Sequence, residues 1–203
     1  MSKIELINHT PLWVASKAIR RCWASDELSD TVNTDDNIGE KDRALIYRVG
    51  NQFAHKSTLR HVTYTFDCNE VSTKTLLALT RHSIGKDISV QSTRYTTSKR
   101  KEDLSFTSTA DEFINGCLDS VMTMVIEAIN RGCKNDDISM LLPQAYNYSF
   151  IMTMNIESLQ HFLKLRTARG AHWDIQAFAW ELYKQIPKAH LYLFEDSIRK
   201  DVS

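Results

Sequence analysis

Glycine and proline are scarce in the 203-residue sequence, which contains only six glycines and three prolines. None of the glycines falls in a G-x-G-x-x-G or Walker-type pattern, so a Rossmann dinucleotide site and a P-loop are both disfavoured. The four cysteines stand far apart and form no C-x-x-C pair. This spacing argues against a disulfide framework or a zinc ribbon, and we expect reduced, mostly buried thiols.

The chain also lacks a net charge, because 25 lysine and arginine residues balance 25 aspartate and glutamate residues. A general binder of nucleic acid polymers or acidic membranes normally carries a basic excess, so neither partner is expected, whereas a local basic pocket is not excluded. No apolar run approaches the roughly 20 residues that span a bilayer. The N-terminal segment MSKIELINHT has no apolar signal-peptide core, and we therefore expect a cytoplasmic protein.

The hydrophobic pattern mixes helical and strand periodicities without βαβ regularity. Helices are predicted at residues 12–23, 42–53, 72–80, 110–131, 156–168 and 171–186, strands at 4–6, 61–66 and 148–154, and polar irregular stretches at 26–40 and 83–100. Apolar residues make up 42% of the chain, enough for a real core. We expect an α+β fold in a single domain over residues 1–203, with a small antiparallel-type sheet packed by several helices.

Two helices carry more specific expectations. Thr10 and Pro11 suit the N-cap and first position of the first helix. In the long helix at about 110–131, apolar residues recur at three-and-four spacing from Phe113 to Ile126. That stripe is either deep core or a subunit interface.

The chemistry-bearing stretch is R81-H82-S-I-G-K-D-I-S-V-Q-S92-T93-R94-Y95, which is dense in hydroxyl and guanidinium groups. Arginine presents a planar fork of donors that matches phosphate, and serine or threonine hydroxyls fill the remaining acceptor positions. The stretch is thus suited to a nucleotide phosphate, and a solvated basic turn is an equal alternative. No G-x-S-x-G or H-E-x-x-H motif occurs, and the histidines lack metal-ligand spacing, so no metal site is expected.

This stretch resembles the signature of flavin-dependent thymidylate synthases, which is R-H-R, seven residues, a serine and then an Arg-Tyr pair. Residues 10–25, 40–61 and 154–166 are similar to three further blocks of that family in the same order. The resemblance covers about residues 2–196 and implies an α+β homotetramer with active sites between subunits. The implied reaction converts dUMP to dTMP, with methylenetetrahydrofolate as carbon donor and FAD, reduced by NADPH, as hydride donor.

The resemblance also implies roles for individual residues. Arg166 would be catalytic, stabilising negative charge on the uracil ring as N3 ionises. The residues implied to bind the cofactor are Ser25, Ser57, Arg81, His82, Ser83, Asn155, Glu157 and His161. Those implied to bind the nucleotide are Arg81, Gln91, Ser92, Thr93, Arg94 and Arg166. Plainer alternatives are a surface arginine or a salt bridge to Asp174 for Arg166, a strand-end residue for Asn155, and a core histidine for His161.

Several positions depart from the family pattern. Eight residues, not seven, precede Ser92 in the signature, whose third position is Ser83 instead of arginine. Arg60 occupies a usually acidic position and Glu157 a usually basic one; the other altered positions are Val90 and Ser139. These changes keep two alternatives open. One is a same-fold enzyme that adds methyl or hydroxymethyl to another pyrimidine nucleotide, and the other is a non-catalytic nucleotide-binding homologue.

Overall fold

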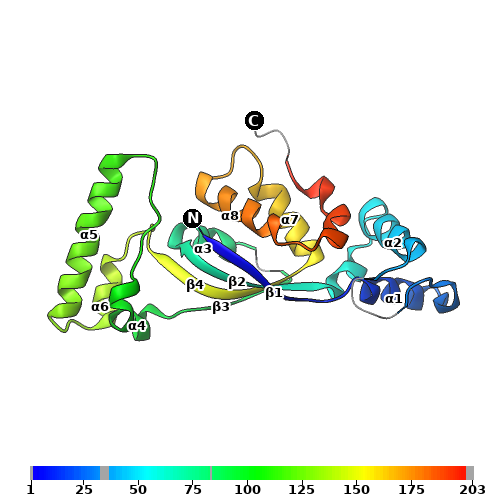
Figure 1. The fold of residues 1–203 in the computed structure, drawn as a ribbon, viewed down its shortest axis with the longest axis horizontal. Helices are drawn as coiled ribbons and strands as arrows, with labels where there is room; N and C mark the ends of the chain where they lie inside the picture. The colour runs from blue at the N-terminus through cyan, green and yellow to red at the C-terminus, as the bar shows by residue number, and fades with distance from the viewer. Residues whose placement is uncertain (1, 33–36, 83, 200–203) are drawn as a thin grey trace.

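The computed structural model describes residues 2–32, 37–82 and 84–199. Its centre is a four-stranded antiparallel sheet in the order β1-β2-β4-β3 (Figure 1). The strands are β1 (Lys3–His9), β2 (Thr63–Ser72), β3 (Lys86–Val90) and β4 (Asn147–Asn155). Along β2, Tyr64, Phe66 and Cys68 are fully buried and alternate with half-buried polar residues. This alternation is typical of an antiparallel sheet that is covered on one face.

The helices fall into three groups around the sheet (Figure 1). Their bounds are α1 (Trp13–Cys22), α2 (Glu40–Tyr47), α3 (Thr73–Thr80), α4 (Thr93–Thr96), α5 (Glu112–Asn130), α6 (Asn135–Ile138), α7 (Ile156–Arg166) and α8 (Trp173–Lys184). Helices α3, α7 and α8 cover one face of the sheet and enclose the core, whereas α1 and α2 lie beyond one end and α4, α5 and α6 beyond the other. No helix within the described ranges is long and apolar enough to cross a membrane.

The α+β prediction is confirmed, and all six predicted helices are present with ends shifted by a few residues. The predicted N-cap is wrong, because α1 is preceded by Leu12 and the hydroxyl of Thr10 instead contacts that of Thr63 at 3.0 Å. The backbone N–H of Thr10 also donates to the carbonyl of Thr63 at 2.9 Å, so this residue extends the sheet pairing.

Strand β3 is missing from the sequence prediction, which assigned residues 83–100 to an irregular stretch. The strand is a short edge strand with only two apolar residues, Ile88 and Val90, and Val90 is exposed. Such a strand lacks the hydrophobic run that identifies a central strand. The cysteines are free as expected, but the expectation of mostly buried thiols is wrong because only Cys68 is buried.

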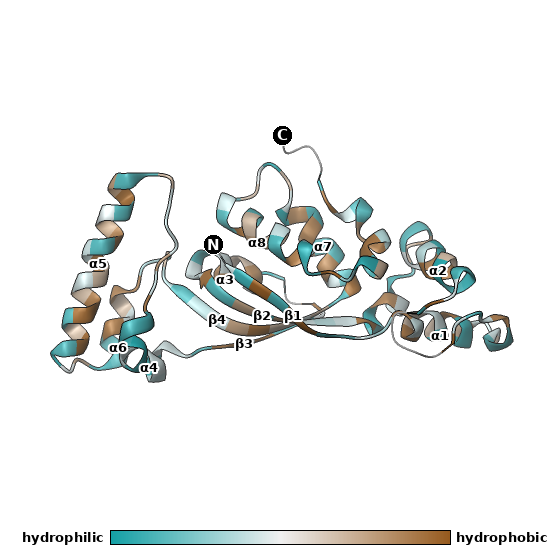
Figure 2. Ribbon diagram, in the orientation of Figure 1, coloured by the Kyte–Doolittle hydropathy of each residue, from teal (hydrophilic) through white to brown (hydrophobic). Residues whose placement is uncertain are grey.

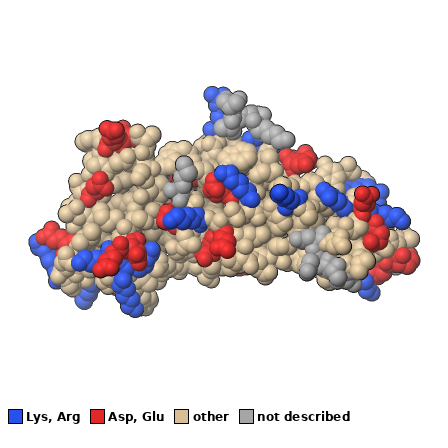
Figure 3. Space-filling view, viewed as in Figure 1, with Lys and Arg blue, Asp and Glu red and all other residues tan. Residues whose placement is uncertain are grey.

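Helix α5 stands away from the core and exposes its apolar stripe. Only Val125 of this helix is buried, while Phe113 is 77% and Met124 51% exposed. Apolar residues recur along its whole length in Figure 2, and Figure 3 shows few charged side chains over its upper part. The deep-core alternative for this stripe is therefore wrong within a single chain.

Candidate functional site

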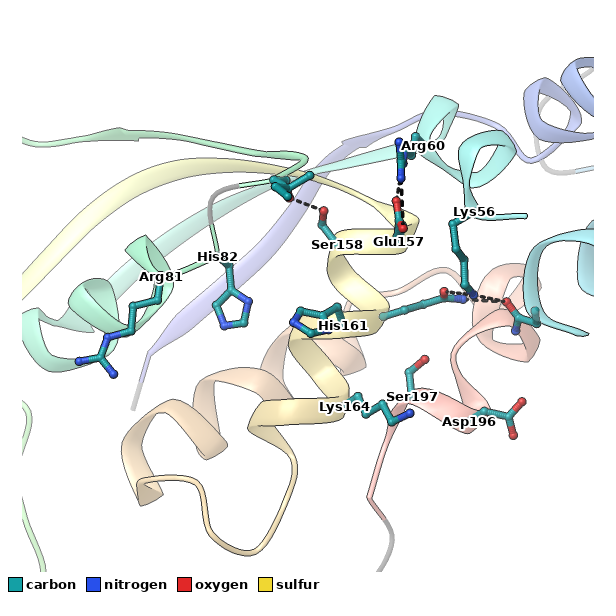
Figure 4. Close-up of a pocket in the computed structure, with 13 residues that line it drawn as sticks. Lys56, Arg60, Arg81, His82, Glu157, Ser158, His161, Lys164, Asp196 and Ser197 are labelled. Atoms are coloured by element: carbon teal, nitrogen blue, oxygen red, sulfur yellow. Dashed lines mark hydrogen bonds and ion pairs between the residues drawn. The ribbon is translucent and has the colours of Figure 1, made fainter. Parts of the chain in front are cut away.

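A cavity of about 590 Å³ lies beside the first turns of α7 (Figure 4). Its walls come from four segments distant in sequence: Asn51 with the 3₁₀ helix η3 (Lys56–His61), the end of α3 with the residues after it, α7, and the C-terminal residues 196–197. Among the predicted site residues, four line it: Arg81, His82, Glu157 and His161. The volume is within the range of small-molecule and cofactor pockets.

A glycine turn joins α3 and β3 to the start of α7. Gly85 has a positive φ of 65°, and a Cβ there would collide with the side chains of Asn155 and Ser158. Asn155 caps α7 by accepting from the N–H of Ser158 at 2.9 Å, and its own N–H donates to the carbonyl of Gly85 at 3.0 Å. The hydroxyl of Ser158 donates to the carbonyl of Ile84. Asn155 is thus a buried capping residue that shapes the site, and this geometry gives its side chain a structural role.

His82 lines the cavity and contacts Arg166, which is not itself among the lining residues. The Nε of Arg166 donates to Nε2 of His82 at 3.3 Å, and the ring of His82 packs edge-on against Phe162 at 5.1 Å. Burial, together with the charges of Arg166, His161 and Lys86, lowers the pKa of His82 to about 4. His82 is therefore neutral at pH 7 and accepts a hydrogen bond from a permanently charged arginine.

The structure excludes two of the alternatives, the salt bridge between Arg166 and Asp174 and the core position of His161. Asp174 accepts hydrogen bonds from Ser72 and Thr75, and among the described residues it forms no ion pair with Arg166. His161 is exposed on the cavity wall, so it is not a core histidine.

The two charge departures from the family pattern are in contact. Arg60 in η3 and Glu157 in the first turn of α7 form a two-pronged ion pair at the cavity wall, with Nη2 of Arg60 3.4 Å from Oε1 of Glu157. A carboxylate in the first turn of a helix also interacts favourably with the helix dipole. The two departures are thus one ion pair between η3 and α7 in this chain.

The predicted nucleotide loop does not reach this cavity within one chain. Gln91, Ser92 and Thr93 follow the far end of β3, and Arg94 is ion-paired with Asp136 of α6 at 2.9 Å. The five residues of β3 separate this loop from Gly85 by roughly 16 Å.

The other predicted cofactor residues are also outside the cavity lining. Ser25 follows α1, where its carbonyl accepts from Arg20, and Ser57 is exposed on η3. Ser83 lies outside the described residues. The single chain therefore brings together only part of the predicted set.

Some cavity residues were not predicted from the sequence, namely Asn51, Lys56, Ser158, Gln160, Lys164, Asp196 and Ser197. One signal was available, since Lys164 lies three and seven residues after His161 and Glu157 and so shares their helix face. Asp196 and Ser197 carry no such signal, because only the tertiary fold brings the C-terminal segment to this wall. No group of three metal-ligating side chains occurs in the described part of the chain.

The α+β fold thus carries a pocket whose guanidinium, ammonium and imidazole groups suit an anionic ligand. A family model described as "Thymidylate synthase complementing protein" matches residues 5–190. The flavin-dependent thymidylate synthase of Wolinella succinogenes is 36% identical, covering 94% of this chain and 96% of the relative. That of Helicobacter pylori is also 36% identical, covering 95% and 97%.

The solved structures agree with these sequence relatives. Thymidylate synthase X from Helicobacter pylori, crystallised with FAD and dUMP, has a TM-score of 0.88 at 32% identity, covering 98% of this chain and all of that chain (100%). A UMP/dUMP methylase from Streptomyces cacaoi has a TM-score of 0.73 at 18% identity, a likeness of fold alone. The chain belongs to the flavin-dependent thymidylate synthase family.

The first prediction concerns the protonation of His82. Replacing Arg166 with glutamine removes the cation beside the ring, so the pKa of His82 should rise from about 4 toward, but not to, 6.5, because burial persists. Histidine ring signals followed by NMR across pH 3–8 measure this. With Arg169→Gln, at an exposed arginine, the pKa should stay near 4. The pKa of His82 is lower in the folded protein than in the unfolded chain. Protonation of His82 therefore reduces the free energy of unfolding as the pH falls from 6.5 to 4.

The second prediction concerns the Arg60–Glu157 pair. Arg60→Glu and Glu157→Arg should each lower the urea midpoint slightly, because each places like charges together. The double variant should recover most of this loss but not all of it, because an arginine then stands at the helix N-terminus. Urea unfolding of the four proteins measures the coupling, and the exposed Glu127–Arg131 pair is the control cycle. If the stability changes of the two single variants simply add up in the double variant, the two side chains do not interact.

Proposed function

We propose that this chain is a flavin-dependent thymidylate synthase that converts dUMP to dTMP by reductive methylation. The observation that carries the proposal is the contact of Arg166 with His82, which lines the cavity together with Arg81 and His161. Its relatives of near-equal length bear this activity in their names, and the Helicobacter pylori enzyme was crystallised with FAD and dUMP. The carbon donor we propose is methylenetetrahydrofolate and the reductant is NADPH.

The cavity fits FAD in its chemistry. Arg60 and Arg81 supply cationic donors for a diphosphate, while the neutral ring of His82 and the 78% exposed side chain of Ile84 offer surfaces for a flat heterocycle. Bound FAD would supply the hydride that reduces the transferred carbon to a methyl group. We assign His161 and Glu157 to the same wall, where Glu157 acts by holding Arg60.

Arg166 is the proposed catalytic residue. Its Nε is occupied by His82, and no side chain in the described ranges bonds its two terminal nitrogens, which leaves them for a ligand. Burial lowers the pKa of Arg166, but the group stays charged because its ordinary value is so high. A fixed cation beside the uracil ring stabilises the negative charge that develops as N3 ionises.

We further propose that the site is completed in a homotetramer. The nucleotide loop at Ser92–Arg94 and the cavity lie at opposite ends of β3, so a neighbouring chain would bring one to the other. The exposed apolar stripe of α5 adjoins that loop and offers a surface for such a contact. A nucleotide substrate and free thiols also fit the cytoplasm as the place of action.

The direct test is turnover. The purified chain with FAD, dUMP, methylenetetrahydrofolate and NADPH should form dTMP, identified by mass spectrometry. Arg166→Ala should reduce turnover by about 100- to 1000-fold while FAD absorbance persists, because the cation acts in the transition state.

Arg169→Ala, an exposed arginine three residues further on, is the matched control and should retain full turnover. A protein that retains no flavin and forms no product from dUMP would overturn the proposal. Methylation of a different pyrimidine nucleotide, or a hydroxymethylated product, would support the same-fold alternative instead.

The assembly has its own test. Phe113→Glu with Met124→Glu places two carboxylates on one face of α5 and should convert the tetramer, measured by light scattering, to smaller species that bind FAD weakly. The same positions changed to leucine keep the face apolar and should preserve the tetramer. A native protein that is an active monomer of 23.4 kDa would remove the assembly proposal.

A further inference from the structure

The cavity continues beyond the flavin and nucleotide residues into a second half that has no assigned role. Figure 4 shows Lys56 and Lys164 on the side of His161 away from His82 and Arg81. Lys56 comes from η3 and Lys164 from α7, so two separate elements bring ammonium groups to this half.

A rigid amide network holds Lys56. Its Nζ donates to Oδ1 of Asn51 at 3.3 Å and to Oε1 of Gln160 at 2.8 Å. The amide nitrogens of Asn51 and Gln160 both donate to the carbonyl of Leu193, at 3.0 and 2.7 Å, which orients both amide oxygens toward the lysine. An ammonium has three donors, so two are used to fix its position and the third is available for a ligand.

The carboxylates on the same walls are already engaged. Glu157 is paired with Arg60, and Oδ2 of Asp196 accepts from the hydroxyl of Tyr47 at 3.3 Å. Within the described ranges, neither Lys56 nor Lys164 has a carboxylate within ion-pair distance. Burial lowers the pKa of Lys56, the charges of Glu157 and Asp196 oppose this shift, and the charge of Lys164 adds to it, so the two ammonium groups are close enough to interact.

We propose that Lys56 and Lys164 form an anion subsite for the charged tail of a second reactant. The inference rests on the proposed function, whose two co-substrates both carry anionic groups remote from the reacting atoms. These groups are the glutamate carboxylates of methylenetetrahydrofolate and the 2′-phosphate of NADPH. An ammonium acts as a point charge that suits either anion, and its fixed position lowers the entropic cost of binding.

Equilibrium binding to the FAD-loaded protein tests the subsite without requiring turnover. The probes are tetrahydrofolate with one and with three glutamates, and NADPH beside NADH. Lys164→Gln should raise the Kd of one anionic probe about tenfold, equal to about 1.4 kcal/mol. It should also abolish the preference for the longer tail, or for NADPH over NADH, whichever reactant uses the site. Lys184→Gln, on the outer face of α8 and paired with Glu181, is the control and should change neither.

The outcomes separate the possible explanations. Loss of tail-length preference assigns the subsite to the folate, and loss of the NADPH preference assigns it to the reductant. Unchanged Kd values for all four probes in Lys164→Gln would overturn the subsite, whether or not dUMP is methylated. Lys56→Gln should act in the same direction, and its melting temperature shows whether the amide network survives. A protein that binds the probes with the expected selectivity but forms no dTMP would instead refute the proposed function.

Discussion

The interlocking of Gly85 with the first turn of α7 is the constraint on which the rest of the site depends. A side chain at position 85 would occupy the space of Asn155 and Ser158, so only glycine brings the chain this close at positive φ. The contact joins the end of β4, the cap of α7 and the start of β3. Because these three elements carry Glu157, His161 and the segment after His82, one backbone turn sets the distance between the cavity walls.

The charge exchange at Arg60 and Glu157 shows why single positions are poor guides to a site. Taken separately, an arginine at a usually acidic position and a glutamate at a usually basic one each suggest a weakened grip on ligand. In the fold they are one ion pair that bridges η3 and α7. In this pair the cation belongs to η3 and the carboxylate to the first turn of α7.

The sequence was sufficient for the fold class and for the residues that local patterns mark. The alternation in β2 and the three-and-four spacing of apolar residues in α5 are local signals, and each leads to an element that the structure contains. Edge strand β3 and the start of α1 were decided by pairing with distant strands, which no local pattern reports. The same holds for the cavity, since tertiary packing alone brings Lys56 and Asp196 to the walls of one cavity. The family resemblance led to Arg81 and His82, which line the cavity. It did not indicate that Ser92 lies at the other end of β3 from them in a single chain.

The zero net charge of the chain and the cationic character of the cavity are compatible, because they depend on different things: the total charge and its distribution. A net charge of zero argues against a general excess of basic surface. It is compatible with a cationic cavity, because net charge is a sum over the whole chain and does not fix where the charges lie. Burial in the fold then determines the protonation states of the groups at and beside the cavity. Burial keeps His82 neutral, whereas Arg166 beside it keeps its charge at every accessible pH. A fixed cation thus lies beside a neutral hydrogen-bonding ring, an arrangement that suits the stabilisation of negative charge on a heterocycle.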